Sequence, residues 1–75
     1  MPYIAVKCYP RDDETKRRLA ERLSEVIIEE LGCPAAAVTV SVEDVTPEAW
    51  EETGEKREIE PGLDHVLIRS GEKRY

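Results

Sequence analysis

The fold of this chain is constrained most by one long periodic segment, residues 13–31, which lies between two short segments that alternate like β-strands. Its apolar residues recur at helical spacing on one face: Leu19, Leu23, Val26, Ile27 and Leu31. Residues 2–9 and 38–45 instead read as strands with a period of two: Ile4, Val6 and Cys8 share one face of the first, and valines alternate with polar residues in the second. A strand, a long helix and a second strand in this order predict an α+β fold built on a right-handed βαβ unit with two parallel strands.

Both ends of the predicted helix carry boundary signals. Asp12 or Asp13 can cap its start, because a carboxylate can accept hydrogen bonds from the free N–H groups of the first turn. Gly32 suits the left-handed residue that follows a helix, and Pro34 prevents continuation. We therefore expect one long crossover helix over residues 13–31.

The predicted sheet has one covered and one bare face. The helix covers the apolar face of both strands, which is formed by Ile4, Val6, Cys8, Val38, Val40 and Val42. Two strands with an uncovered face are not stable alone in water. The geometry therefore predicts that a second copy completes the sheet.

The size of the chain leads independently to the same expectation. A chain of 75 residues buries only about 60% of its unfolded surface, so its core is marginal. Such small domains usually need disulfides, a metal or oligomerisation. Cys8 and Cys33 are expected to be reduced thiols, since nothing in the sequence indicates secretion. We expect one cytoplasmic domain, residues 1–75, with a βαβ core over 2–50 and a C-terminal arm over 51–75.

Charge and motifs exclude several classes of partner. The net charge of −6 argues against nucleic acid and against an anionic membrane surface. No apolar run approaches the length of a membrane span. No His/Cys cluster has the spacing of metal ligands, and no glycine-rich phosphate loop is present, so neither a metal nor a cofactor is expected. A small anionic substrate remains compatible with a local cation.

The arm is harder to interpret than the core. Thr46 and Pro47 predict a short helical turn, and the following Trp50 is expected in the core, at an interface or in a pocket wall. Residues 51–58 are polar without a clear period and are predicted to form a loop. Residues 62–69 fit either a short helix or an extended segment, and residues 70–75 are expected to be a loose tail.

Two side chains near the amino end are chemically notable. Loss of Met1 would turn Pro2 into a free secondary amine at the start of a strand, where it could act as a base, an acid or a nucleophile. The alternative is that Pro2 is simply a small second residue that permits methionine removal. Lys7 is interpreted as a solvated or interface lysine rather than a Schiff-base residue.

Several pieces of the chain together resemble the 4-oxalocrotonate tautomerase family. They are the initial Met1-Pro2, a strand, Arg11 before an acidic-capped helix, a Gly32 and Pro34 stop, a valine-rich second strand and an aromatic residue at position 50. Within the family, residues 2–11, 26–28, 47–50 and 58–61 resemble the PptA group of small tautomerases. The resemblance covers roughly residues 2–68.

This resemblance implies a fold and a chemistry. The family fold is a βαβ unit whose sheet is completed by dimerisation, with three dimers forming a hexamer in some members. The implied function is a cofactor-free keto–enol tautomerase that moves a proton within an enol or unsaturated 2-oxo acid, with Pro2 as general acid/base. Arg11 would bind the substrate carboxylate, in its own or a neighbouring subunit's site, and Trp50 would line the pocket.

One substitution implies a substrate preference. Thr39 stands where many relatives carry a second arginine, so its hydroxyl could donate a hydrogen bond to substrate without adding charge. The resemblance therefore favours aryl-pyruvate enols, with one carboxylate, over doubly charged diacids. Two alternatives stay open: a decarboxylase or hydratase that uses Pro2 on the same scaffold, and a non-catalytic oligomeric module.

Overall fold

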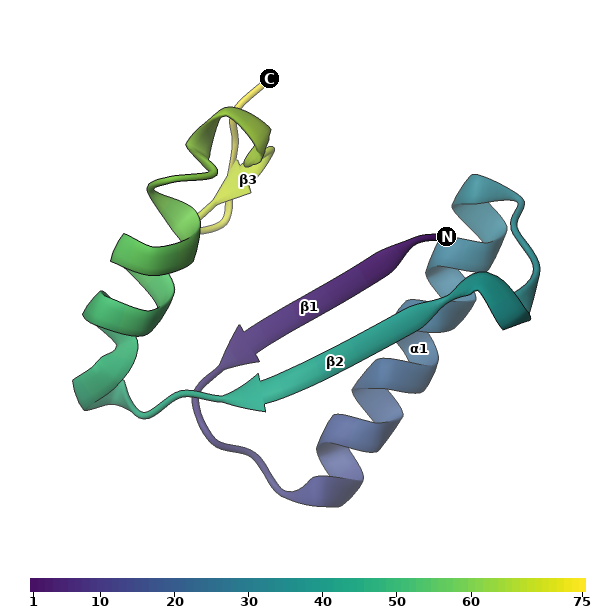
Figure 1. The fold of residues 1–75 in the computed structure, drawn as a ribbon, viewed down its shortest axis with the longest axis horizontal. Helices are drawn as coiled ribbons and strands as arrows, with labels where there is room; N and C mark the ends of the chain where they lie inside the picture. Colours follow the sequence, from purple (N-terminus) through teal and green to yellow (C-terminus); the bar gives the residue numbers. More distant parts are fainter.

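The computed structural model describes residues 1–75 and is built around two parallel strands. β1 (Tyr3–Cys8) pairs with β2 (Thr39–Asp44), in a register that runs from Tyr3 opposite Thr39 to Cys8 opposite Asp44. The crossover between them is α1 (Asp13–Leu31), followed by the short turn η1 (Ala35–Ala37) (Figure 1). The predicted parallel βαβ unit is confirmed.

The boundaries of α1 are also as predicted. Asp12 occupies the N-cap position with an extended backbone, although its side chain makes no capping hydrogen bond. Gly32 adopts the left-handed conformation with φ 65°, and its N–H donates to the Ile28 carbonyl at 2.9 Å. A glycine is needed there because a Cβ atom disfavours positive φ. Neither α1 nor any other helix combines the length and apolarity that a membrane crossing requires.

The face that α1 turns to the sheet differs in part from the prediction. The half-buried positions of α1 are Thr15, Lys16, Leu19, Ala20, Leu23, Ser24, Ile27 and Ile28. Val26 and Leu31 are 52% and 62% exposed, so their assignment to the covered face was wrong. The half-buried residues form adjacent pairs that recur every four positions (15/16, 19/20, 23/24 and 27/28). Val26 lies just outside this face of the helix. These two side chains leave apolar surface on the outside of the helix.

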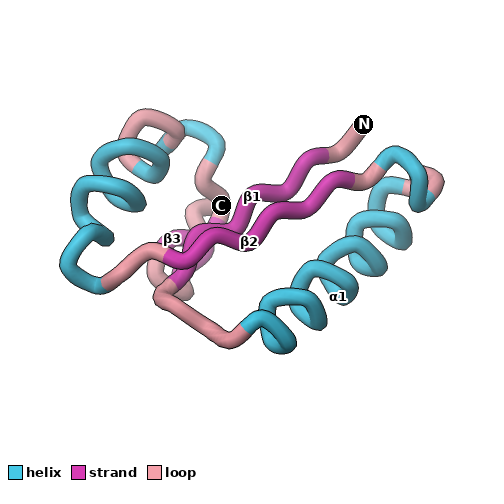
Figure 2. The backbone as a smooth tube through the Cα atoms, turned by 60° about the horizontal axis from the view of Figure 1, so that its bottom comes forward, coloured by secondary structure: helices cyan, strands magenta, loops and turns pink.

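The other face of the sheet is open to solvent. Tyr3, Ala5 and Ser41 are exposed there, and the Tyr3 hydroxyl lies 3.4 Å from the Ser41 hydroxyl. Figure 2 shows α1 on one side of the strands and the C-terminal arm on the other, near one end. Only Val45 and Gly54 are buried in the whole chain. One copy therefore encloses almost no core, and completion of the sheet by a second copy stays a prediction.

The arm begins with the predicted turn but continues as a helix. In η2 (Pro47–Ala49) the Thr46 hydroxyl accepts a hydrogen bond from the Ala49 N–H at 3.3 Å, as expected for a cap. It is followed by η3 (Glu51–Ile59), a π-helix with i→i+5 hydrogen bonds, so the loop predicted for residues 51–58 was wrong. The segment was predicted as a loop because it is mostly polar and contains Gly54, which disfavours a helix interior.

The end of the chain is ordered as well. A short turn, η4 (Leu63–His65), precedes an antiparallel hairpin of β3 (Ile68–Arg69) and β4 (Glu72–Lys73). The open alternative for residues 62–69 is thus resolved as a helical turn followed by a strand. The hairpin turn has positive φ at Ser70 (50°) and Gly71 (83°), which is typical of a tight two-residue connection. The loose tail predicted for residues 70–75 was wrong.

A glycine lets η3 pack against its own first aromatic residue. Gly54 is buried against Trp50, and a Cβ atom at Gly54 would lie 3.0 Å from Cδ2 and Cε2 of the indole. On another side, the indole meets the edge of Tyr9, with ring centroids 5.6 Å apart and planes at 88°. Trp50 is therefore held between the end of β1 and the first turn of the arm.

Substitution of Gly54 tests this packing. We expect Gly54→Ala to displace the indole, because an added methyl group in a filled site costs about 1–3 kcal/mol, offset in part by about 1 kcal/mol of helix propensity. The emission of Trp50, the single tryptophan, should shift to longer wavelength and the melting temperature should fall. Arg57→Ala, at an exposed position of η3, is the matched control. An unchanged emission spectrum in Gly54→Ala would contradict the packing.

Candidate active site

Pro2 is held at the amino end of the sheet. Its ring is half-buried, and its carbonyl oxygen accepts a hydrogen bond from the Thr39 N–H at 3.1 Å. Thr39 is exposed beside it. The side chain of Met1 is 95% exposed, so removal of this residue would cost no packing. A nitrogen freed at Pro2 would start from a fixed position on β1.

Arg11 and Trp50 lie beyond the opposite end of the strands. Trp50 contacts Tyr9, two residues before Arg11. A strand as long as β1 spans about 20 Å, so Pro2 and Arg11 of one chain are far apart. In the structure, Pro2 therefore lies next to Thr39. Trp50 lies at the other end of β1, close to the loop that contains Arg11. The structure does not bring the four residues into one site within a single chain.

The guanidinium of Arg11 has no carboxylate partner. Its Nη1 donates to the Pro10 carbonyl at 2.8 Å, and its backbone N–H donates to Asp44 Oδ1 at 3.4 Å. The other oxygen of Asp44 pairs with Lys16 Nζ at 3.1 Å. Since Lys16 neutralises Asp44, the exposed charge of Arg11 is available to an external anion.

Two ionisable groups beside Arg11 have shifted pKa values. The hydrogen bond from Lys16 to the Asp44 carboxylate raises the pKa of Lys16 above its ordinary value. The Thr15 side chain, by hydrogen bonding to the Asp12 carboxylate, lowers the pKa of Asp12. Both shifts favour the charged forms of these side chains.

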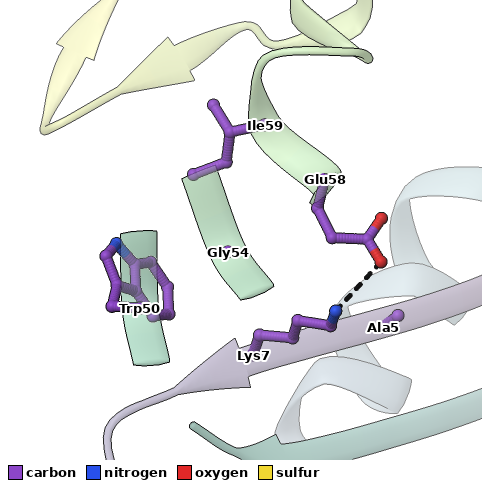
Figure 3. A pocket seen from close by; sticks show the side chains of 6 residues that line it. All are labelled: Ala5, Lys7, Trp50, Gly54, Glu58 and Ile59. Atoms are coloured by element: carbon purple, nitrogen blue, oxygen red, sulfur yellow. Dashed lines mark hydrogen bonds and ion pairs between the residues drawn. The ribbon is translucent and has the colours of Figure 1, made fainter. Parts of the chain in front are cut away.

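A pocket lies between β1 and η3. Its volume is about 240 Å³, and Figure 3 shows its lining residues: Ala5, Lys7, Trp50, Gly54, Glu58 and Ile59. One wall is the indole of Trp50. Ala5 and Lys7 reach the pocket from the sheet face that α1 leaves bare, so the arm and the strand build it together.

Lys7 is the polar residue of this pocket that the sequence did not reveal. Its Nζ lies 3.0 Å from Glu58 Oε1 and donates to the Thr53 carbonyl at 3.3 Å, and its side chain is only 19% exposed. These partners are 46 and 51 positions away in the chain. Neither local sequence nor periodicity could therefore signal the contact.

Groups of acidic, histidine and cysteine side chains that could hold a metal ion are absent from the structure. Cys8 and Cys33 are half-buried free thiols that do not pair with each other.

Comparison with known proteins places this arrangement in a family. A family model described as "Tautomerase enzyme" matches residues 2–56. The chain is 37% identical to Tautomerase PptA of Enterobacter sp. (strain 638), over 95% of this chain and 96% of that protein. It is 36% identical to Tautomerase PptA of Klebsiella pneumoniae (strain 342) and 32% identical to that of Escherichia coli O127:H6, each with the same coverage.

The resemblance found in the sequence, the parallel βαβ unit and these matches all indicate the same family. The chain therefore belongs to the tautomerase family of isomerase enzymes.

Proposed function

We propose that this protein is a cofactor-free keto–enol tautomerase in which Pro2, exposed by loss of Met1, is the general acid/base. The main support is the hydrogen bond from the Thr39 N–H to the Pro2 carbonyl, 3.1 Å long, which fixes the proline at the edge of the sheet. The exposed Met1 and the tautomerase relatives support the same proposal.

The proposed reaction is a proton shift in the enol of a 2-oxo acid. The neutral amine of Pro2 takes the enol hydroxyl proton while the carbonyl forms, and the resulting ammonium returns a proton to the neighbouring carbon. No electron or atom is gained or lost overall. A general base works best with a pKa near the working pH. Apolar surroundings and a nearby cation would lower the pKa of this secondary amine towards that range.

We further propose that the site is shared between two copies. Pro2 and Arg11 lie at opposite ends of β1, and antiparallel association of two copies brings the amino end of one strand to the carboxyl end of the other. Arg11 and Trp50 of one subunit would then face Pro2 of its partner in a homodimer, or in a hexamer of three dimers. A guanidinium can hold a carboxylate by two parallel hydrogen bonds.

The substrate class follows from the charges around Pro2. Thr39 offers a hydroxyl but no second positive charge near Pro2, and Trp50 offers an aromatic wall. An aryl-substituted enol with one carboxylate suits these groups better than a dicarboxylate. Enolised phenylpyruvate is therefore the substrate that we would assay first.

Replacement of Pro2 tests the acid/base assignment. Pro2→Ala should lower the ketonisation rate of enolised phenylpyruvate by at least about a hundredfold, the usual share of a general acid/base. Size-exclusion chromatography should show unchanged assembly. Mass spectrometry should show that the active protein lacks Met1. Full activity in Pro2→Ala, or in protein that keeps Met1, would refute the assignment.

Mixing two inactive variants tests the shared site. Arg11→Ala should raise KM for the carboxylate substrate, whereas Arg17→Ala on the exposed side of α1 should not. Random reassembly of equal amounts of Pro2→Ala and Arg11→Ala chains should restore roughly a quarter of the wild-type sites, because such a site needs one intact residue from each chain. A mixture as inactive as its components would show that one chain supplies both groups.

A further inference from the structure

The pocket beside Trp50 contains a positive charge that the proposed mechanism does not use. Lys7 supplies it, from the bare side of the sheet, and the remaining walls are apolar apart from Glu58. An ammonium group carries three N–H donors. The structure gives two of them partners, the Glu58 carboxylate and the Thr53 carbonyl, and both partners belong to η3.

The two partners of this ion pair differ in exposure. The side chain of Lys7 is 19% exposed, whereas that of Glu58 is 56% exposed. Glu58 can therefore turn into solvent, while Lys7 stays inside the pocket. Ion pairs with a solvent-exposed member are weak, so an incoming anion can replace the carboxylate of Glu58.

Glu58 places a carboxylate at 3.0 Å from Lys7 Nζ and next to the Trp50 wall. A ligand with a flat apolar group and one carboxylate would match this arrangement, with the ring against Trp50 and Ile59 and the anion at Lys7. The same ligand with a neutral amide in place of the carboxylate would keep the apolar contact but would not form the charge-assisted hydrogen bond with Lys7.

We propose that Lys7 is a carboxylate-binding residue of the substrate pocket, and that Glu58 is an internal occupant which the substrate displaces. This inference rests on the proposed tautomerase function for the identity of the substrate. It adds Lys7 to Arg11 as a cation that binds the single carboxylate of the substrate, and it makes Glu58 a competitor that weakens the binding of anions.

Ligand binding can be measured without catalysis, because Trp50 is the single tryptophan and lines the pocket. Phenylacetate and its uncharged analogue phenylacetamide are titrated against the intact oligomer, and Trp50 fluorescence is followed. The wild-type protein should bind phenylacetate about tenfold or more tightly than phenylacetamide, as expected for a charge-assisted hydrogen bond. The Pro2→Ala variant should keep this preference while it loses tautomerase activity.

Four variants separate the roles of charge and shape. Lys7→Met should lose the preference for phenylacetate, and Lys7→Arg should largely keep it. Glu58→Gln should bind phenylacetate more tightly than wild type, because the internal competitor has lost its charge. Lys56→Met is the matched control, since Lys56 pairs with Glu52 at 3.2 Å on η3 but does not line the pocket.

Kinetics provide the second readout. With enolised phenylpyruvate, Lys7→Met should raise KM more than it lowers kcat, and Glu58→Gln should lower KM. Circular dichroism shows whether each variant is folded, and Glu58→Gln tests the inference independently if Lys7→Met fails to fold.

The inference is overturned if Lys7→Met keeps the preference for phenylacetate, or if Glu58→Gln binds phenylacetate less tightly. It is also overturned if phenylacetate leaves Trp50 fluorescence unchanged while the emission depends on protein concentration, since a second copy would then fill the pocket. Either result with an inactive Pro2→Ala variant leaves the proposed function standing. Conversely, if Pro2→Ala keeps its activity while Lys7→Met loses the preference for phenylacetate, the acid/base role of Pro2 is refuted and Lys7 remains a carboxylate-binding residue.

Discussion

The parallel pairing of β1 with β2 under a single helix is the constraint on which the rest of the structure depends. The crossover α1 can cover only one face of the strands, and with two strands there is no interior strand at all. Val45 and Gly54 are consequently the only buried residues. One copy therefore leaves open the bare sheet face, the strand edges and apolar positions such as Val26.

The same pairing decides where functional groups can lie. Parallel strands place both amino ends together, so Pro2 and Thr39 are neighbours through a backbone hydrogen bond. Both carboxyl ends lie at the other edge, where Arg11 follows β1 and Trp50 follows β2. The arm then folds back over β1 and adds a pocket in which Lys7 meets Glu58.

How far the sequence predicts this structure depends on the range of the contacts. The bounds of α1, the Gly32 end and the Thr46 cap follow from local signals and are confirmed. The π-helix was missed because residues 51–58 are mostly polar and contain Gly54, and the hairpin because Ser70 carries a positive φ that residues other than glycine seldom adopt. Lys7 could not be identified because its partners are about fifty positions away in the chain, and only the fold of the arm brings them close.

The length of β1 has a consequence for how such a protein behaves in the cell. If Pro2 and Arg11 act together across two copies, turnover per chain depends on the total concentration of the polypeptide. Dilution below the dissociation constant of the assembly would silence the protein without unfolding it or blocking its pocket. The total reaction rate would then rise more than proportionally with gene dosage, because a higher concentration of chains also increases the fraction that is assembled.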